Sequence, residues 1–282
     1  VIIPAFNYSK VLPRAVLSVM AQREPGVEVV VVDDGSTDDT DNVLSQLKAA
    51  WPMLKAIRQD NAGAAAARNH GVRISSGRYL LMLDADDELL PGSLAAFKQA
   101  VSGHPGVGLV LAGYISVTED GRERSKPASE IGAGAAVDLI RRYLLEKRIS
   151  ISHGCSLFRR DLLQQCPYPE QLRSSEDIAV FAYVLVAAPA VRIEDAVAKI
   201  YKHPDSLRHQ RHGEVPSAIV DSVFAKLPVT CQSLRPAYYA QRLLSLFRAA
   251  AMVGEKSEAR ALYVEAMRVS PGQALKWTYL RK

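Results

Sequence analysis

Aspartates grouped at two points of the chain are the residues best suited to chemistry. Asp84 and Asp86 lie one residue apart, directly after the apolar stretch 79–83, and two further acidic residues follow them. Carboxylate oxygens are the ligands that Mg²⁺ and Mn²⁺ prefer, and such an ion usually keeps one or two carboxylates together with substrate phosphates. Acidic residues after a strand can also cap the next helix. Because uncompensated carboxylates this close repel each other, the pattern favours a divalent-metal site.

A second acidic pair, Asp33 and Asp34, follows the β-branched run 27–32. The Gly-Ser pair at 35–36 permits a turn and could cap the next helix, so a plain loop explains those two residues. It does not explain two adjacent acids, one of which could accept a hydrogen bond from a nucleobase imide. The chain has neither a glycine-rich dinucleotide motif nor a Walker lysine motif. A bound diphosphate would therefore be neutralised by a metal and by side chains such as Arg68.

A third acidic pair, Glu176 and Asp177, precedes the helical pattern 178–186. A carboxylate at such a position could act as a general base. Two acids in the first turn of a helix also stabilise the helix dipole and need no catalytic role. From these residues alone, the structural role is the favoured alternative.

Short apolar stretches alternate with helical patterns over the first hundred residues. Strands are predicted at 1–3, 27–32, 54–58, 79–83 and 107–117, and helices at 10–20, from Ser36 or Thr37 to 50, after 63 and at 91–101. This alternation predicts an α/β fold with a parallel, doubly wound sheet. Ligands bind beyond the carboxyl ends of the strands in such sheets, which is where the aspartates fall. Residues 135–201 have a mixed pattern, and the chain beyond 204 is mostly helical.

The net charge of +5 is unevenly distributed along the 282 residues. Residues 1–200 carry 22 basic and 24 acidic side chains, whereas residues 201–282 carry 13 and 6. The main body is therefore slightly acidic, which argues against a nucleic-acid-binding protein. Three widely spaced cysteines predict reduced thiols of a cytoplasmic protein, at least two of them core residues, and the apolar run 178–188 is too short to span a membrane. The sequence begins inside an apolar run without Met, so an upstream targeting segment is left open.

These motifs, in their order, resemble the glycosyltransferase family 2 members of the GT-A fold. The resemblance rests on 1–7 (VIIPAFN), 31–38 (VVDDGSTD), 61–63 (NAG), 67–69 (ARN), 77–79 (GRY), 83–87 (LDADD), 175–177 (SED) and 201–206 (YKHPDS). Each motif is weak alone, but together they form a specific pattern over about two hundred residues. The part of the chain after about residue 207 lies outside it.

The resemblance implies a role for each matching residue on the donor side. Pro4, Ala5 and Phe6 would line the pocket for the nucleobase and ribose, with Asp34 on the base. Asp84 would lie beside the ribose.

The resemblance also implies which residues act on the diphosphate and the acceptor. Arg68 would face the base or the diphosphate, and Asp86 would hold the Mn²⁺ or Mg²⁺ that bridges it. Asp177 would be the catalytic base of a single-displacement, inverting transfer. His203 lies in a segment that closes over the site in many relatives, where it could contact the metal or the diphosphate.

The predicted organisation is a GT-A-type catalytic domain at 1–203 and a lid loop with a basic helical region at 204–282. The catalytic domain would comprise a nucleotide-sugar half at about 1–115 and an acceptor half at about 116–203. The tail arginines, Arg242, Arg248, Arg260 and Arg268, lie among apolar residues. Amphipathic helices packed on the body explain this pattern, and their basic face could also contact anionic lipid headgroups or a lipid-linked acceptor.

The predicted function is metal-dependent, inverting transfer of a sugar from a nucleotide-sugar to a hydroxyl of a glycan or lipid-linked acceptor. A UDP-sugar is favoured because Asp34 suits an imide N–H, although thymine has the same group and GDP is left open. The resemblance places the enzyme in bacterial surface-polysaccharide or lipopolysaccharide assembly, in the cytoplasm or on the inner face of the membrane. Two alternatives are a haloacid-dehalogenase-type phosphatase with Asp84 as nucleophile and a non-catalytic sugar-nucleotide-binding module.

Overall fold

The first part of the chain forms a small parallel sheet. The computed structural model describes residues 1–202 and 215–276, and its first sheet has the order β1-β2-β3, with β1 at Ile2–Ala5, β2 at Val30–Asp33 and β3 at Lys55–Arg58. Helices α1 (Leu12–Met20) and α2 (Thr40–Ala50) connect these strands. Ala5 lies opposite Asp33, and Asp33 lies opposite Arg58. The carboxyl ends of the three strands are therefore level with one another.

The second sheet is mixed. Its order is β4-β8-β6-β9-β5, and β7 pairs with β6; the strands are β4 (Tyr79–Leu81), β5 (Glu88–Leu89), β6 (Leu109–Val117), β7 (Glu123–Lys126), β8 (Ser156–Arg159) and β9 (Ala190–Tyr201). Strands β6 and β9 run parallel, whereas β4–β8, β5–β9, β6–β7 and β6–β8 are antiparallel pairs. A parallel bridge from Ile2 to Met82 joins the two sheets. The α/β architecture is confirmed, and its parallel strand pairs are β1–β2, β2–β3 and β6–β9.

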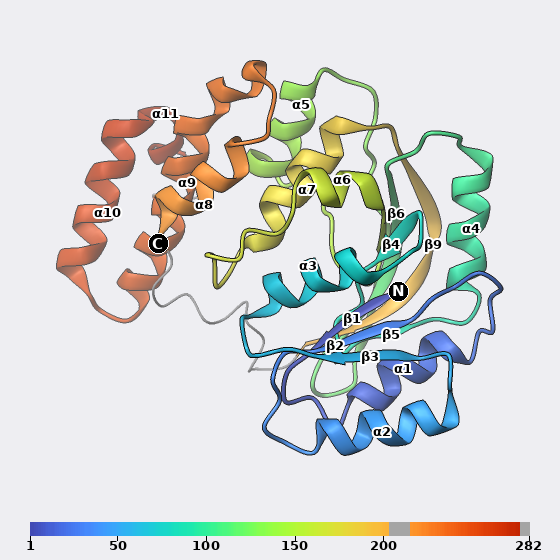
Figure 1. Cartoon of the computed structure of the whole chain (residues 1–282). Coiled ribbons are helices and arrows are strands. Elements are labelled where there is room, and N and C mark those ends of the chain that lie inside the picture. Colours follow the sequence, from blue (N-terminus) through green and yellow to red (C-terminus); the bar gives the residue numbers. More distant parts are fainter. Residues whose placement is uncertain (203–214, 277–282) are drawn as a thin grey trace.

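Helices cover both sides of these sheets (Figure 1). Helix α3 (Ala64–Ile74) packs against β1 and β2, on the side away from α1 and α2, and α4 (Ser93–Gly103) packs against β6 and β9. The later helices are α5 (Ala136–Ile140), a π-helical turn at Arg141–Leu145, α6 (Arg160–Gln165), α7 (Glu176–Ala187), α8 (Pro216–Phe224), a 3₁₀ turn at Val229–Leu234, α9 (Arg235–Met252), α10 (Lys256–Val269) and α11 (Pro271–Ala274).

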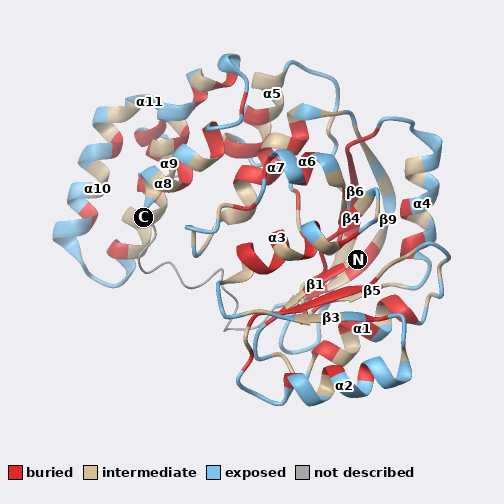
Figure 2. Ribbon diagram, viewed as in Figure 1, coloured by how far each residue is buried: buried red, intermediate tan, exposed pale blue. Residues whose placement is uncertain are grey.

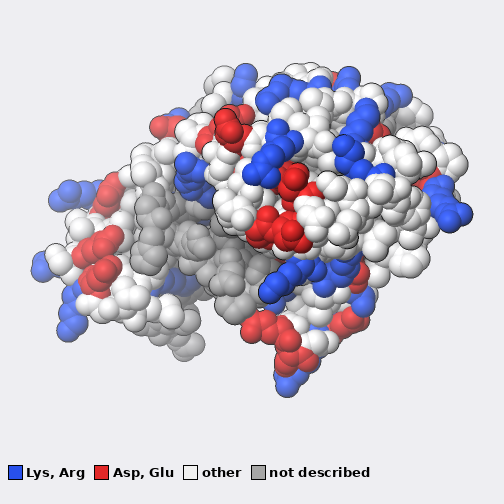
Figure 3. All heavy atoms as spheres, turned by 60° about the horizontal axis from the view of Figure 1, so that its bottom comes forward, with Lys and Arg blue, Asp and Glu red and all other residues white. Residues whose placement is uncertain are grey.

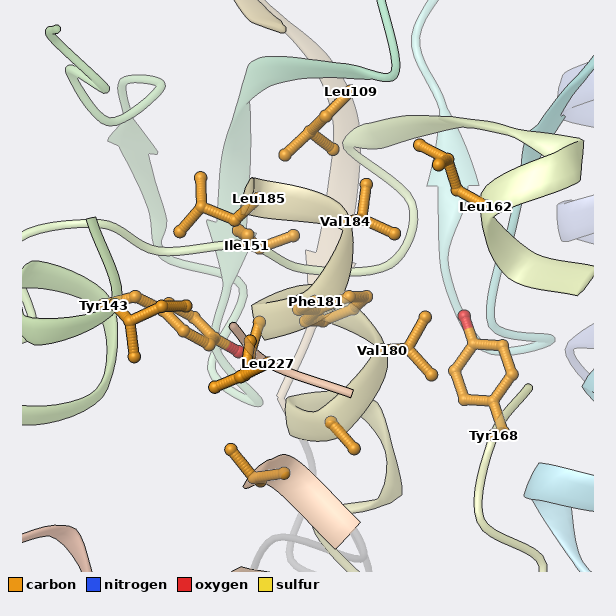
Figure 4. Packing of buried hydrophobic residues seen from close by; sticks show 14 of the residues in the cluster. Leu109, Tyr143, Ile151, Leu162, Tyr168, Val180, Phe181, Val184, Leu185 and Leu227 are labelled. Carbon is orange, nitrogen blue, oxygen red and sulfur yellow. The ribbon is translucent and has the colours of Figure 1, made fainter. Parts of the chain in front are cut away.

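Helix α7 is the centre of the largest hydrophobic cluster (Figure 4). Its inner residues are fully buried, and Phe181 stacks on Phe158 with ring centroids 5.4 Å apart. The same cluster includes Ile2 from β1 and Tyr238 from α9. Helix α8 and the start of α9 therefore pack on the body formed by the preceding strands and helices, as expected for the first tail helix, while α10 packs on α9 and is exposed along much of its length (Figure 2). All three cysteines are buried, where at least two were expected in the core.

The predicted cap of α2 at Ser36 or Thr37 is wrong, because α2 begins at Thr40. The backbone N–H of Asn7 donates to Ser36 Oγ at 2.9 Å, and the backbone N–H of Thr37 donates to Asn7 Oδ1 at 2.7 Å. These contacts hold the residues after β2 as a loop tied to the end of β1. Among the described residues, no helix is long and apolar enough to cross a membrane.

The close packing of α3 on β1 predicts a stability effect for Gly71→Ala. A Cβ at position 71 would lie 2.4 Å from Cγ2 of Ile2, a fully buried residue that cannot move aside. Overpacking costs about 1–3 kcal/mol and exceeds the gain of up to about 1 kcal/mol in helix propensity. We expect a lower urea midpoint for Gly71→Ala and an unchanged or slightly higher one for Gly272→Ala, whose Cβ would meet nothing within 4 Å. Equal midpoints would contradict this packing.

Candidate active site

The ends of β1, β2 and β4, the N-terminal half of α3 and the first turn of α7 carry the predicted site residues. Pro4 and Ala5 form the end of β1, and Ala5 is buried. Phe6 follows them with 42% of its surface exposed. Asn7 adopts a left-handed conformation with φ +59°. An exposed aromatic ring at the end of a strand offers a stacking surface, so Phe6 is suitably placed to contact a planar base.

The two adjacent acids after β2 have different surroundings. Asp33 is almost fully buried and accepts hydrogen bonds from the Ser36 N–H and from Arg58, at 2.9 and 2.8 Å. This ion pair fixes the end of the parallel sheet. Asp33 is therefore a structural residue.

Asp34 ties β2 to the start of α3. Its Oδ1 accepts hydrogen bonds from Gln59 Nε2 at 2.8 Å and from the Ala62 N–H at 2.9 Å, and its Oδ2 accepts from the Gly63 N–H at 2.8 Å. Asp34 is 3% exposed, and Gly63, with φ +93°, precedes the first residue of α3. A carboxylate oxygen has two lone pairs, so Oδ2 keeps capacity for one further donor. Asp34 orients the 59–63 loop whether or not it also contacts a base.

Arg68 is the central charge of the site. It is 6% exposed and donates to Asp84 Oδ1 at 3.0 Å and to Glu176 Oε1 at 2.8 Å. Its guanidinium lies 5.6 Å from the centroid of the Tyr168 ring. Burial opposes the positive charge, but the two carboxylates outweigh it and raise the pKa of Arg68 above its usual value. One buried cation thus joins α3, the turn after β4 and the start of α7.

Asp177 is the second residue of α7 and is only partly exposed. Burial and the negative charge of Glu176 raise its pKa to about 6, although Arg68 acts in the opposite direction. The residue before this acidic pair, Ser175, is held at φ +62°. A carboxyl group with a pKa near 6 is charged at neutral pH and is a better base than an ordinary aspartate. Sequence reasoning favoured a structural role for this pair from the residues alone, because burial is not visible in the sequence.

Asp84 and Asp86 are the carboxylates suited to a cation. Both are partly exposed on the turn after β4. The described residues contain no cluster of three or more His, Cys, Asp or Glu side chains that could by themselves enclose a metal ion. A Mg²⁺ or Mn²⁺ ion needs only one or two carboxylates when substrate phosphates complete its shell, and the pair fits that mode of binding.

Arg14, which sequence reasoning missed, and Tyr201, to which it gave no role, hold this turn in place. Arg14 on α1 donates to the main-chain oxygen of Asp86, and its guanidinium lies 3.8 Å from the centroid of the Tyr201 ring. The Tyr201 N–H donates to Asp87 Oδ1 at 2.9 Å, and its hydroxyl donates to Glu88 at 2.9 Å. No local pattern marks Arg14, because it acts on a turn that lies 72 residues further along the chain.

The structure therefore brings Arg68, Asp84, Glu176 and Asp177 into one cluster. Asp34 lies at the neighbouring strand end and Asp86 on the turn after β4. His203, together with Arg208, His209, Arg211 and His212 of the expected lid, lies outside the described residues.

The sequence profile of Glycosyl transferase family 2 matches residues 1–166. The chain belongs to this family. The match covers more than half of the chain and includes Asp34, Arg68, Asp84 and Asp86, whereas Asp177 lies beyond it.

Relatives and solved structures are consistent with this membership. The succinoglycan biosynthesis protein ExoU of Rhizobium meliloti is 44% identical over 95 residues, which cover 33% of this chain and 28% of ExoU. The GalNAc(5)-diNAcBac-PP-undecaprenol β-1,3-glucosyltransferase of Campylobacter jejuni is 29% identical over 178 residues, covering 62% and 56% of the two chains. The chain thus spans less than two thirds of these relatives. The structure of S. aureus TarS 1–349 in complex with UDP-GlcNAc superimposes with a TM-score of 0.71 at 20% identity, over 97% of this chain and 81% of TarS, which shows a shared GT-A-type fold.

The raised pKa of Asp177 predicts a pH-dependent stability effect for Asp177→Asn. The folded state disfavours the charged form of this carboxyl group. The protonated form therefore stabilises the fold fully below the unfolded pKa near 3.8, and this contribution is lost as the pH rises through about 6. We expect Asp177→Asn to melt about 2–4 °C higher than the parent at pH 7.5, with the difference disappearing near pH 4. Thermal melts at several pH values would measure this. The control is Asp195→Asn, an exposed position at which we expect the same difference at both pH values. The same pH-independent result for Asp177→Asn would contradict the raised pKa.

Proposed function

We propose that this chain transfers a sugar from a nucleotide-sugar donor to a hydroxyl group and inverts the configuration of the anomeric carbon. The observation that carries the proposal is the carboxyl group of Asp177. Its pKa is raised to about 6, chiefly by burial, and it lies beside the Arg68–Asp84–Glu176 cluster beyond the strand ends. In a parallel α/β sheet this edge is where ligands bind. Membership of Glycosyl transferase family 2 supports the same reaction class.

In the proposed reaction, Asp177 accepts the proton of the acceptor hydroxyl. The hydroxyl oxygen forms a bond to the anomeric carbon as the bond from that carbon to the diphosphate oxygen breaks. The nucleoside diphosphate leaves with the electron pair of the broken bond, and the proton remains on Asp177. General-base assistance of this kind contributes about 10²–10⁴-fold to a rate. Glu176, held by Arg68, raises the basicity of Asp177 through its negative charge.

On the donor side, Pro4, Ala5 and Phe6 would form the wall of the base pocket, and Asp34 would accept the imide N–H through Oδ2. Asp84 would lie beside the ribose. This donor geometry favours a UDP-sugar, and the TarS structure with UDP-GlcNAc supports it.

Asp86, together with Asp84, would hold Mn²⁺ or Mg²⁺, which when bound supplies positive charge against the diphosphate. Arg14 would keep the turn that carries these carboxylates in position through the main-chain oxygen of Asp86. Arg68 would contribute positive charge on the same side of the site.

On the acceptor side, the hydroxyl would belong to a glycan or to a lipid-linked glycan. The names of the two relatives, one in succinoglycan biosynthesis and one acting on an undecaprenol-linked glycan, support bacterial surface-polysaccharide assembly. The domain organisation would have a catalytic part at 1–203, with an acceptor half from about 116, and a region at 204–282 that contains the lid.

The proposed location is the cytoplasm or the inner face of the cytoplasmic membrane. Of the four tail arginines, Arg260 and Arg268 on α10 are exposed, whereas Arg242 and Arg248 on α9 are partly buried. Acidic and basic groups are interspersed on the face shown in Figure 3, α10 included. Attraction to anionic lipid would therefore be weak and sensitive to salt.

Membership of Glycosyl transferase family 2 argues against the phosphatase alternative. The binding-module alternative requires a test. A protein that only binds a sugar nucleotide would not need a base with a raised pKa. The effect of Asp177 on turnover distinguishes the two functions.

A nucleotide screen tests the donor site. We expect UDP to raise the melting temperature more than GDP does, and to do so more strongly with Mn²⁺ than without it. Asp86→Asn should remove the metal-dependent part of the shift, because a ligand carboxylate is lost, while the exposed control Asp195→Asn should retain it. Differential scanning fluorimetry with UDP, dTDP and GDP would measure these shifts. If no nucleotide gives a metal-dependent shift, the proposed donor site is wrong.

Substitution of the base tests catalysis. We expect Asp177→Asn to lower turnover by at least about 10²-fold and to leave nucleotide affinity unchanged, since the base acts on the acceptor. In the parent enzyme, kcat/KM should fall as the pH drops through about 6, where Asp177 becomes protonated. Release of nucleoside diphosphate over a panel of glycan acceptors would measure both effects. Full turnover by Asp177→Asn would exclude Asp177 as the base.

A further inference from the structure

Two side chains connect the carboxylate of Asp34 to helix α3. Gln59 Nε2 donates to Asp34 Oδ1 at 2.8 Å, and Gln59 Oε1 lies 2.7 Å from His70 Nδ1. Asp34 follows β2, Gln59 follows β3, and His70 lies in the middle of α3. The chain His70–Gln59–Asp34 therefore joins three elements at the edge of the sheet where the nucleobase is proposed to bind.

The donors and acceptors of this chain can be arranged in only one way. Both carboxylate oxygens of Asp34 accept hydrogen bonds from N–H groups, so Gln59 must present its NH₂ group to Asp34. The other end of the Gln59 amide is then a carbonyl oxygen, which can only accept. His70 Nδ1 therefore carries a hydrogen and donates it to Gln59 Oε1. The orientation of the amide and the protonated ring nitrogen both follow from the carboxylate.

This arrangement uses both lone pairs of Asp34 Oδ1. That oxygen accepts from Gln59 and from the Ala62 N–H, whereas Oδ2 accepts only from the Gly63 N–H within residues 1–202 and 215–276. An N–H of a base would therefore bind at Oδ2. Loss of the Gln59 donor would open a lone pair on Oδ1 and remove one of the three contacts that stop the carboxylate from turning.

His70 is a rigid starting point for this chain, because its neighbours fix α3. Arg68 forms the two ion pairs of the site, and Asn69 exchanges hydrogen bonds with the main chain of Tyr168. Helix α3 also packs against β2 (Figure 1). The main-chain N–H of Gln59 donates to the last residue of β2 at 2.9 Å, so the middle of the chain is fixed as well.

We propose that His70 is a positioning residue for base recognition, which acts through Gln59 to hold Asp34 Oδ2 toward the N3–H of a uracil or thymine. This inference rests on the proposed function and refines its donor site. Cytosine has no hydrogen on N3, so its N3 can only accept. A fixed carboxylate therefore binds uracil and repels cytosine, because two acceptors that face each other share no hydrogen. A carboxylate that can turn loses part of both effects.

Calorimetry on the full chain with UDP and with CDP, each in the presence of Mn²⁺, tests this role. The two nucleotides share the ribose and the diphosphate, so the ratio of their affinities reports the base contact. We expect the parent to bind UDP more tightly than CDP. His70→Leu should lower the UDP-to-CDP ratio by about three- to tenfold, mainly by weakening UDP binding.

Two further variants assign this effect to the hydrogen bond of His70. His70→Asn should restore the ratio, because its amide nitrogen can replace Nδ1 as the donor. The control is His104→Leu, which should leave the ratio unchanged, because His104 is exposed and its Nδ1 contacts the main-chain oxygen of Ala100 in α4. A cooperative thermal melt shows that each variant is folded.

A double variant tests whether His70 acts through Gln59. Gln59→Leu removes the link, so the addition of His70→Leu should have no further effect on the ratio. A role of His70 in the packing of α3 alone would change both affinities equally and would persist in Gln59→Leu. Failure of the parent chain to bind any nucleotide would refute the proposed donor function as well. A preference for UDP in the parent that is unchanged in His70→Leu would refute this inference alone.

Discussion

The ion pairs of Arg68 are the constraint on which the rest of the site depends. A buried guanidinium must be paired, because leaving such a charge uncompensated costs several kcal/mol. Its two partners come from different parts of the chain, Asp84 after β4 and Glu176 at the start of α7. The neighbouring Asn69 exchanges hydrogen bonds with the main chain of Tyr168. Helix α3 is thereby fixed to the turn after β4 and to the start of α7.

The same pairing sets the chemistry of Asp177. Arg68 offsets part of the negative charge of Glu176 and Asp84, yet burial and Glu176 still raise the pKa of Asp177 to about 6. A greater positive charge at this point would lower the pKa of Asp177 and make it a weaker base. Without any cation, the carboxylates of Asp84, Glu176 and Asp177 would repel one another. The arrangement keeps a carboxylate that is charged at neutral pH and still basic.

The tail helices add a second influence on the same residue. Helix α8 and the start of α9 belong to the core that contains β1, and Arg242 reaches Ser175. The excess positive charge of residues 201–282 is therefore partly directed at the site. Arg242 and Arg248 are partly buried on α9, whereas Arg260 and Arg268 face solvent on α10.

The amino-acid sequence by itself determined the α/β class, the positions of most elements to within a few residues, and the placement of aspartates after strands. It could do so because β-branched runs, helical periodicity and turn residues act over short distances along the chain. Sequence reasoning failed at the cap of α2, where Asn7 holds residues from another loop. It also missed Arg14, whose partner lies 72 residues away. Only the tertiary structure decided which acid is structural and which is basic: Asp33 is paired with Arg58, whereas Asp177 lies half-buried beside a like charge. Burial and the through-space charge of Glu176 set the pKa of Asp177, and neither can be read from the residues adjacent in the sequence.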